Sequence, residues 1–292
     1  GSKYTVPPIQ GTDLKGVHFL QTVEEAQKIR DEIGRLAGKN AVIIGAGLIG
    51  IEVTEAFKKK GLNITLVERL DTAMGQLLDP EIAYHLHNEL KANGASLRMG
   101  ETVKQILGDD EGNVTTVVTD SGEIPADIVL ISVGVRPNVR LAKDMGLTLG
   151  KTGAIAVDRH LRTSDPDIYA GGDCVENINR VNGKPIYAPM GSTANKHGRV
   201  IGDNICGIPT EFNGVLGTAI CKVFNINVAR TGLSETQAKS EGFDYITVLN
   251  PAPDRAHFLK DAKLIILKFI VDKTTGKLIG AQMVGAGDVA KR

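Results

Sequence analysis

The most regular hydrophobic pattern in the chain lies between residues 37 and 70. An all-apolar run at 41–44 predicts a buried strand, a glycine-rich turn follows, and a second apolar run at 63–67 predicts another strand. The segment between them has the helical period and ends in three lysines and Gly61, which complement the helix dipole and stop the helix. The pattern therefore predicts a β-α-β unit. The expected apolar face of its helix comprises Ile49, Val53, Ala56 and Phe57.

Helix signals flank this unit on both sides. Thr22 and Glu25 have the spacing of a capping box, and Asp79, directly before a proline, is the expected N-cap of a later helix. His85 and His87 lie two positions apart on that later helix and point away from each other, so we interpret them as surface residues and not as a metal pair.

Alternating apolar and polar positions predict strands in the rest of the chain. Residues 103–107 and 114–119 have the pattern of a hairpin, and 128–133 that of a buried strand. Near the C-terminus, 263–271 is expected to pair with 277–284. Helices alternate with strands first and strands dominate later, so the expected fold class is α/β with a separate strand-rich region.

The composition is that of an ordinary globular protein. Of 292 residues, 42% are hydrophobic and 23% are charged, and 34 basic residues balance 34 acidic ones. This balance provides no field to recruit nucleic acid or an anionic membrane, and no apolar run is long enough for a membrane span. Because Cys174, Cys206 and Cys221 are far apart, we expect neither a disulfide framework nor a metal site, and a reducing, cytoplasmic location is the default.

Gly45, Gly47 and Gly50 have the G-x-G-x-x-G spacing of a dinucleotide-binding turn. The first glycine permits the tight turn, the second lets the backbone approach a pyrophosphate, and the third lets the helix pack on the strand. Glu68 ends the second strand, where a carboxylate binds the adenosine ribose hydroxyls and repels a 2′-phosphate. NAD is therefore favoured over NADP, although Arg69 weakens the preference slightly. The alternative, a β-α-β unit that binds nothing, is disfavoured because all five features are in register.

A second glycine pair precedes a carboxylate at Gly171-Gly172-Asp173, after an expected strand end at 168–170. Ligands of open parallel sheets bind outside the carboxyl ends of the strands, so Asp173 is a candidate cofactor ligand. Taken alone, Asp173 fits the N-cap of a helix equally well. Cys174 has no adjacent base or second thiol, and we interpret it as a small packing residue.

Three motifs in this order give a specific resemblance. They are the glycine turn at 45–50, the segment Gly134-x-Arg136-Pro137-Asn138, and residues 163–173, TSDPDIYAGGD. Together they resemble the flavin-dependent pyridine nucleotide-disulfide oxidoreductases, and within these the branch of NADH oxidases and coenzyme A disulfide reductases. The resemblance covers essentially the whole chain. It implies a Rossmann-like NAD-binding domain inserted in an FAD-binding domain, followed by a partial α+β dimerisation domain.

The resemblance also implies two cofactor sites. Asp173 would bind the ribityl chain of FAD, and the amides of a helix that begins near Gly191 would stabilise negative charge on the reduced flavin. The implied NAD site comprises Gly45, Gly47, Leu48, Ile49, Gly50, Glu52, Glu68, Arg69 and Gly134, and the implied FAD site comprises Gly172, Asp173, Gly191, Ser192 and Thr193.

Relative to this family, the chain is expected to be a fragment. The family's first glycine-rich unit, which binds the ADP half of FAD, and the redox cysteine of the disulfide reductases have no counterpart here, and the C-terminal end is short. Residues 1–36 are then a remnant of the FAD-binding domain with a linker, 37–137 the NAD(H)-binding domain, 138–211 the C-terminal portion of the FAD-binding domain, and 212–292 a truncated dimerisation domain.

The implied function is that of a homodimeric flavoprotein that passes hydride from NADH to FAD and on to a small electron acceptor: oxygen, peroxide, or a thiol disulfide or persulfide. The catalytic cysteine would belong to the missing N-terminal part. Phe258 and Leu259 occupy the region of a tyrosine pair found in coenzyme A disulfide reductases, which puts a coenzyme A substrate in doubt. Two alternatives stay open. The chain either binds NAD(H) without flavin or turnover, or reduces a small iron-sulfur protein, which the stretch 277–292 disfavours.

Overall fold

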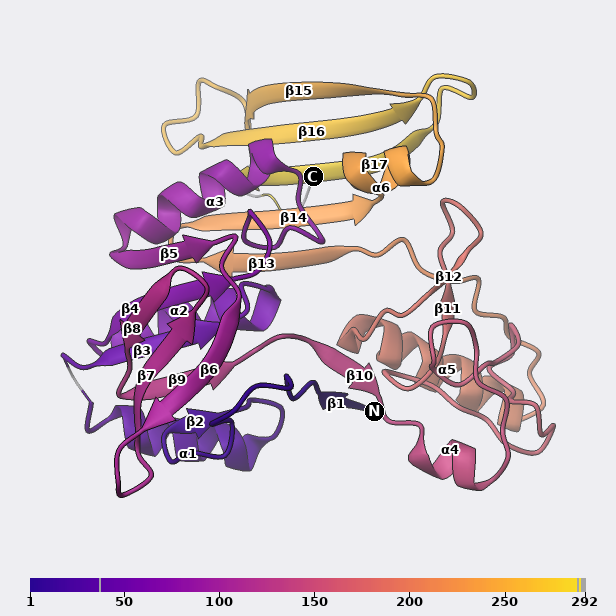
Figure 1. Cartoon of the computed structure of the whole chain (residues 1–292). Coiled ribbons are helices and arrows are strands. Elements are labelled where there is room, and N and C mark those ends of the chain that lie inside the picture. The colour runs from indigo at the N-terminus through magenta and orange to yellow at the C-terminus, as the bar shows by residue number, and fades with distance from the viewer. Residues whose placement is uncertain (37, 288, 290–292) are drawn as a thin grey trace. The chain divides into compact units, whose positions relative to one another are not determined.

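The structure, a computed structural model, describes residues 1–36, 38–287 and 289 (Figure 1). Contacts between residues divide the chain into two compact units. The smaller unit comprises Gly1–Lys3 and Val135–Thr218, and the larger comprises Tyr4–Gly134 and Ala219–Arg292. Residues 4–36, part of the segment expected to be a remnant of the FAD-binding domain with a linker, are grouped with the parallel sheet described next.

The larger unit contains a five-stranded parallel sheet with the strand order β2-β9-β3-β4-β5. Helix α2 (Leu48–Lys59) connects β3 to β4, and α3 (Pro80–Ala92) connects β4 to β5. The predicted β-α-β unit is therefore confirmed. The strands are β2 (Val17–His18), β3 (Asn40–Ile44), β4 (Asn63–Glu68), β5 (Ala95–Met99) and β9 (Ile128–Ile131).

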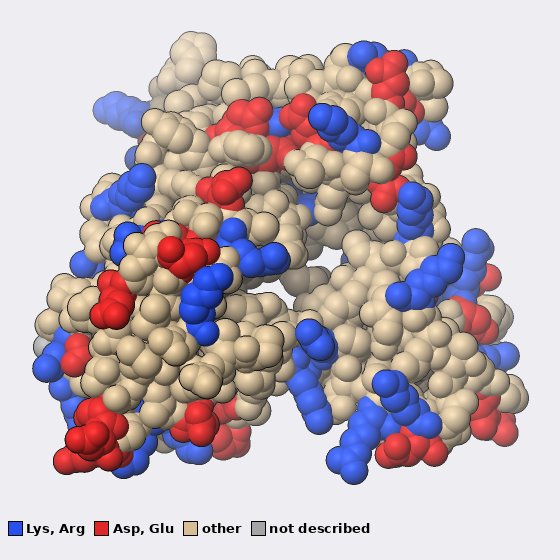
Figure 2. All heavy atoms as spheres, in the orientation of Figure 1, with Lys and Arg blue, Asp and Glu red and all other residues tan. Residues whose placement is uncertain are grey.

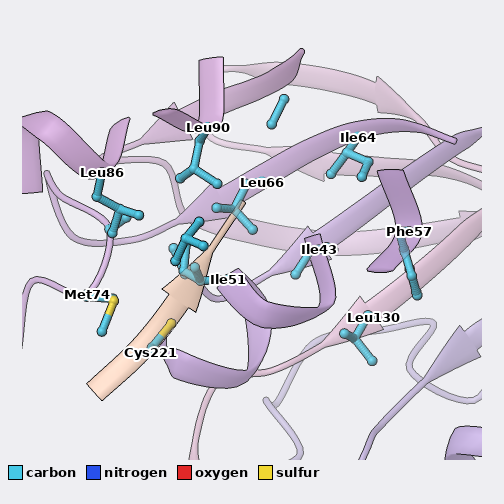
Figure 3. Close-up of a cluster of buried hydrophobic side chains, with 14 of the residues drawn as sticks. Ile43, Ile51, Phe57, Ile64, Leu66, Met74, Leu86, Leu90, Leu130 and Cys221 are labelled. Carbon is cyan, nitrogen blue, oxygen red and sulfur yellow. The ribbon is translucent and has the colours of Figure 1, made fainter. Parts of the chain in front are cut away.

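Alternate residues of this sheet enter two different cores. Ile43, Leu66 and Leu130 lie in a core shared with helices, which also contains Ile29 and Ile33 of α1 (Val23–Ile33) (Figure 3). The capping box predicted for α1, from Thr22 to Glu25, is confirmed. The other face packs on a three-stranded antiparallel sheet, so the predicted hairpin has one strand more than expected. Its strands are β6 (Val103–Gly108), β7 (Val114–Thr119) and β8 (Gly122–Pro125).

The buried face of α2 differs from the predicted one. The structure buries Gly50, Ile51, Thr54 and Phe57, whereas Ile49 is 39% exposed. The prediction is confirmed for Phe57 and wrong for Ile49 and Ala56, which are exposed, because it placed the face by side-chain hydrophobicity alone. Gly50 packs directly on the preceding turn, and this contact sets the rotation of the helix and leaves Ile49 at the surface.

An antiparallel sheet with the order β13-β14-β17-β16-β15 completes the larger unit. The predicted pairing of 263–271 with 277–284 is confirmed between β16 and β17. Cys221 of this sheet lies in the same core as residues of α2 and α3 (Figure 3). Val223, Val228 and Val284 belong to that core as well. The elements are β13 (Ala219–Val223), β14 (Ile226–Gly232), α6 (Glu235–Ser240), β15 (Tyr245–Pro253), β16 (Leu264–Asp272) and β17 (Leu278–Gly285).

A buried ion cluster joins the start of α3 to this antiparallel sheet. The Nζ atom of Lys268, a side chain only 2% exposed, lies 3.2 Å from Asp79, 3.0 Å from Glu81 and 2.7 Å from Glu235. Asp79 occupies the predicted N-cap position of α3 but makes no side-chain capping bond there. Its carboxylate instead accepts from the Glu235 amide and from Nε2 of Gln282, because the buried lysine and these donors attract it away from its own helix.

The smaller unit is mostly irregular and contains one long helix, α5 (Gly191–Ile205). The prediction of a strand at 168–170 was wrong. Tyr169 forms only an isolated bridge with Arg162, which does not continue into a ladder of paired residues. Asp173 lies in a turn and not at a helix N-cap. The remaining elements are β1 (Ser2–Tyr4), which pairs with β10 (Val135–Pro137), α4 (Arg140–Asp144), β11 (Asn177–Ile178) and β12 (Pro185–Ile186).

Charged side chains of both signs occur across the face drawn in Figure 2, in keeping with the net charge of zero. Over the residues that the structure describes, no helix is both long and apolar enough to cross a lipid bilayer.

Candidate functional site

The glycine turn lies where three parallel strands end. Its first residue, Gly45, donates its amide to the Val67 carbonyl (2.8 Å), and the Ser132 amide donates to the Ile44 carbonyl (2.7 Å). Gly45 has a φ of +102°, and a Cβ there would lie 2.3 Å from the Ser132 oxygen. Both the backbone conformation and the lack of space therefore require glycine at this position. The two hydrogen bonds join the ends of β3, β4 and β9 at this edge of the sheet.

The other two glycines of the motif, Gly50 and Gly47, serve different purposes. A Cβ on Gly50 would lie 2.0 Å from the Gly45 carbonyl oxygen, so the start of α2 packs directly on the turn. Gly47, in contrast, has a φ of −79°, and a Cβ there would meet no described atom within 4 Å. The fold itself does not require glycine at Gly47. The open space above its backbone is where a ligand can approach closely.

The N-terminus of α2 carries no capping group of its own. Its N-cap residue is Gly47, no side chain of the described residues caps it, and its first turn contains no acidic residue. The first-turn amides of Leu48, Ile49 and Gly50 have no acceptor within the helix. With the partial positive charge of the helix dipole, they form a site that suits the two negative charges of a pyrophosphate.

Glu68 holds the turn in place. Its Oε2 accepts from the Ala46 amide (2.8 Å) and its Oε1 accepts from the Leu70 amide (2.9 Å). Each carboxylate oxygen has a second lone pair, so the half-buried carboxylate keeps the capacity to accept from ribose hydroxyls. The structure thus gives Glu68 an orienting role for the turn, which the sequence analysis did not include.

Two further residues that support this turn were missed. The amide of Met74, a buried residue with a φ of +53°, donates to the Ala46 carbonyl at 2.8 Å. His87 is half-buried and its Nε2 accepts from the Ala73 amide at 2.9 Å, so its interpretation as a surface residue was wrong. The sequence carries no signal for Met74, because its left-handed backbone is imposed by the loop that closes on Ala46.

The remaining expected NAD residues are exposed and less constrained. Glu52 points to solvent on α2, Arg69 follows Glu68, and Gly134 follows β9 with a φ of +103°. The charge of Glu52 reaches the Cys221 thiol, whose pKa is raised to about 12, first by burial and then by Glu52 and Glu55. Cys221 is therefore a protonated core residue and not a nucleophile.

A second polar centre lies in the smaller unit around Asp173. The Ser2 hydroxyl donates to Oδ2 of Asp173 (3.1 Å), and the Tyr187 hydroxyl donates to the Asp173 carbonyl (2.9 Å). Burial, followed by the charges of Asp173 and Cys174, raises the pKa of Tyr187 to about 12, so this hydroxyl keeps its proton. Gly172 precedes the carboxylate with a φ of +80°, a conformation that favours glycine.

The N-terminus of α5 resembles that of α2. Its N-cap is Met190, whose side chain has no oxygen to accept a hydrogen bond, and its first turn contains no acidic residue. Gly191 and Ser192 are exposed, whereas Thr193 is only 8% exposed and donates its amide to the Met190 carbonyl at 3.0 Å. The 15-residue helix thus presents the amides of Gly191 and Ser192, and a ligand with partial negative charge fits there.

A parallel sheet with a glycine-lined, uncapped helix start and an acid at the end of the next strand defines a dinucleotide-binding fold. The sequence matches the family described as pyridine nucleotide-disulphide oxidoreductase over residues 1–188, and the dimerisation domain of the same family over residues 218–291. The chain belongs to the pyridine nucleotide-disulphide oxidoreductase family.

The relatives of this chain include proteins named as sulfur reductases and as NADH oxidases. The chain is 38% identical, over 286 residues, to an NAD(P)H coenzyme A polysulfide/persulfide reductase of Pyrococcus horikoshii, covering 98% of this chain and 64% of the relative. It is 34% identical to an NADH oxidase of Methanocaldococcus jannaschii, covering 100% of this chain and 64% of the relative. A solved NAD-dependent persulfide reductase from A. fulgidus superposes with a TM-score of 0.97 at 46% identity, over 100% of this chain and 54% of that one. The chain thus spans less than two thirds of the length of these relatives.

Proposed function

We propose that the chain carries the NADH site and part of the flavin site of an FAD-dependent NADH oxidoreductase. The observation that carries the proposal is the open backbone at Gly47 over the uncapped start of α2, next to Glu68. The glycines and free amides fit a pyrophosphate and the carboxylate fits an unphosphorylated ribose, so NADH is the expected nucleotide. Glu52, Arg69 and Gly134 would border it.

The expected flavin residues fit FAD in the same way. The Asp173 carboxylate would accept from the ribityl hydroxyls, with Gly172 fixing the turn. The first-turn amides of Gly191 and Ser192 would face the flavin, and Thr193 would border it. When both cofactors are bound, NADH supplies a hydride and FAD accepts it. The α5 amides would then stabilise negative charge through the positive end of the helix dipole. The domain boundaries given from the sequence belong to this proposal.

For the final acceptor we propose a small oxidant: oxygen, peroxide, or a thiol disulfide or persulfide. The Pyrococcus horikoshii and A. fulgidus proteins carry names of sulfur reductases, which supports a sulfur acceptor, and the Methanocaldococcus jannaschii protein is named an oxidase. Phe258, which is 76% exposed, and Leu259 offer no hydroxyl to a coenzyme A substrate. The name of the Pyrococcus horikoshii protein includes coenzyme A, whereas these two residues argue against it, so we propose a persulfide without naming its carrier thiol.

We also propose a homodimer in a reducing, cytoplasmic compartment. The match to the family's dimerisation domain supports the dimer, and the outer edge of the antiparallel sheet offers apolar area for it. The three cysteines are free, as a reducing compartment would keep them. Exposed apolar residues of this sheet lie on β15 (Ile246, Val248 and Leu249), on β16 (Leu264) and on β17 (Leu278).

The test is an anaerobic titration of the FAD-supplemented chain with NADH, followed by absorbance. Protein-bound flavin bands that bleach in proportion to NADH support the proposal. The competing function is an NAD(H)-binding module without flavin. Saturable NADH binding by a chain that retains no flavin after gel filtration would establish the module and contradict the flavoprotein proposal.

A further inference from the structure

His197 lies beneath the Gly172-Asp173 turn and belongs to none of the site residues above. It is on α5, its side chain is 0% exposed, and its ring packs edge-to-face with Phe212 at a centroid distance of 4.4 Å. The Gly172 amide donates to its Nδ1 at 3.0 Å. A buried imidazole thus makes a directed contact with the backbone just before the candidate flavin ligand.

The hydrogen bond fixes the protonation state of this ring. Nδ1 can accept from the Gly172 amide only when it carries no proton, so the single ring proton lies on Nε2. Nε2 is buried, and no other described residue offers it a hydrogen-bond partner. Burial also lowers the pKa of His197. The side chain is therefore a neutral imidazole in one tautomer, and it acts as a hydrogen-bond acceptor.

The turn rests directly on the helix that carries His197. A Cβ on Gly171 would lie 2.8 Å from Cδ1 of Ile201 and 3.0 Å from Cβ of His197, and a Cβ on Gly172 would lie 3.5 Å from that of Ala194. Ala194, His197 and Ile201 share one helical face. This packing is apolar and without direction, whereas the Gly172–His197 hydrogen bond is directional and orients the Gly171–Gly172 peptide. The carbonyl of the same peptide accepts from Sγ of Cys174 at 3.4 Å, within the turn itself, so His197 supplies the contact that joins the turn to α5.

We infer that His197 is a positioning residue of the flavin site: its unprotonated Nδ1 fixes the Gly171–Gly172 peptide, which leads into Asp173, against α5, so that the Asp173 carboxylate and the α5 amides face one flavin. This inference rests on the proposed flavin function. The same helix supplies both the free amides of Gly191 and Ser192 and the imidazole, so one rigid element sets the geometry of both groups. His197 itself does not touch the flavin.

Two substitutions separate the effect of the hydrogen-bond acceptor at residue 197 from the effect of side-chain size. In His197→Asn, Oδ1 can take the place of Nδ1 and accept from Gly172, whereas His197→Leu keeps a side chain of similar size without an acceptor. Each full-length variant is compared with the wild type by hydrogen exchange of the Gly172 amide in the ligand-free chain, by FAD titration with flavin fluorescence, and by urea unfolding. FAD affinity is compared under conditions where all three proteins are folded.

We expect His197→Leu to speed Gly172 exchange and to raise the FAD dissociation constant, each about tenfold, and His197→Asn to restore both to within about threefold of the wild type. Unaltered FAD affinity in His197→Leu, or equal loss in both variants, would overturn the inference. If the wild type binds no FAD, the flavin function fails and this role of His197 fails with it. Gly172 exchange then still shows whether the contact exists, which distinguishes the two failures.

Discussion

The buried lysine at the junction of α3 and the antiparallel sheet offers a quantitative test of the structure. Lys268→Met keeps an unbranched side chain in the core but removes the charge that lies within 3.2 Å of three carboxylates. Asp79, whose side chain is 1% exposed, would keep its hydrogen bonds from Gln282 (2.6 Å) and from the Glu235 amide and its electrostatic attraction to Arg230, but lose the lysine at 3.2 Å. A buried carboxylate that has lost this ion pair is the expected source of instability.

Removing one partner of a buried ion pair costs about 3–5 kcal/mol. Here the lower end applies, because Glu81 is 50% exposed and Glu235 is 35% exposed, so water compensates these two carboxylates in part. We therefore expect Lys268→Met to lower the free energy of unfolding by about 3 kcal/mol. The matched control is Lys273→Met, since Lys273 pairs with Asp244 at 2.8 Å but both side chains are exposed, and it should cost less than about 1 kcal/mol.

Urea unfolding followed by circular dichroism measures both values, and a double-mutant cycle with Asp79→Asn isolates the pair. We expect the double variant to be more stable than the sum of the single effects by about 1–3 kcal/mol, because the second substitution removes the uncompensated carboxylate. Additive effects, or equal costs for Lys268→Met and Lys273→Met, would refute the reasoning.

Four further outcomes follow from the same contacts. Burial lowers the pKa of Lys268, but its hydrogen bonds to Glu235 and Glu81 outweigh burial and raise this pKa above the ordinary 10.5. The free energy of unfolding that the charged lysine contributes at neutral pH should therefore fall as pH rises through the raised value. Wild-type urea midpoints that stay constant over that pH range would contradict this. Glu68→Ala leaves two backbone amides unpaired and should cost about 1–3 kcal/mol in urea unfolding while narrowing the preference for NADH over NADPH in fluorescence titrations; an unchanged preference argues against its ribose role. Gly50→Ala should cost about 1–3 kcal/mol, because its Cβ meets a carbonyl at 2.0 Å; thermal unfolding indistinguishable from wild type would disprove the close packing. Burial, followed by the Lys91 charge, lowers the pKa of His87, so the stability that its neutral ring contributes is complete above the ordinary pKa of 6.5 and is lost as pH falls below it. The free energy of unfolding of His87→Gln should equal that of the wild type at about pH 8 and exceed it at about pH 5. Parallel pH profiles of the two proteins would count against the contact.

The β-α-β unit could be predicted because its signals are local. The apolar run, the glycines, the basic last turn and the terminal acid lie within 28 residues, and the structure keeps them in register. The capping box of α1 was equally readable, since it depends on two residues three apart.

The supporting contacts could not be predicted because they join distant parts of the chain. Asp79 lies in the sequence pattern of an ordinary N-cap, yet its carboxylate accepts a hydrogen bond from Gln282, which lies 203 positions away. His197 has no neighbouring residue in the sequence that indicates its contact with Gly172, 25 positions earlier. Such contacts depend on which faces meet after folding, and the periodicity of a single segment does not contain that information.

The central claim is that the glycine turn binds the pyrophosphate of NADH, and Gly47→Val tests it most directly. A side chain at Gly47 meets no described atom within 4 Å, so the variant should fold, with a free energy of unfolding within about 1 kcal/mol of wild type. Its Cβ and methyl groups would occupy the space of the pyrophosphate. The measurement is a titration with NADH by nucleotide fluorescence. The account predicts saturable binding by the wild type and loss of at least about tenfold in affinity in the folded variant. Equal NADH affinity in the two proteins would contradict it.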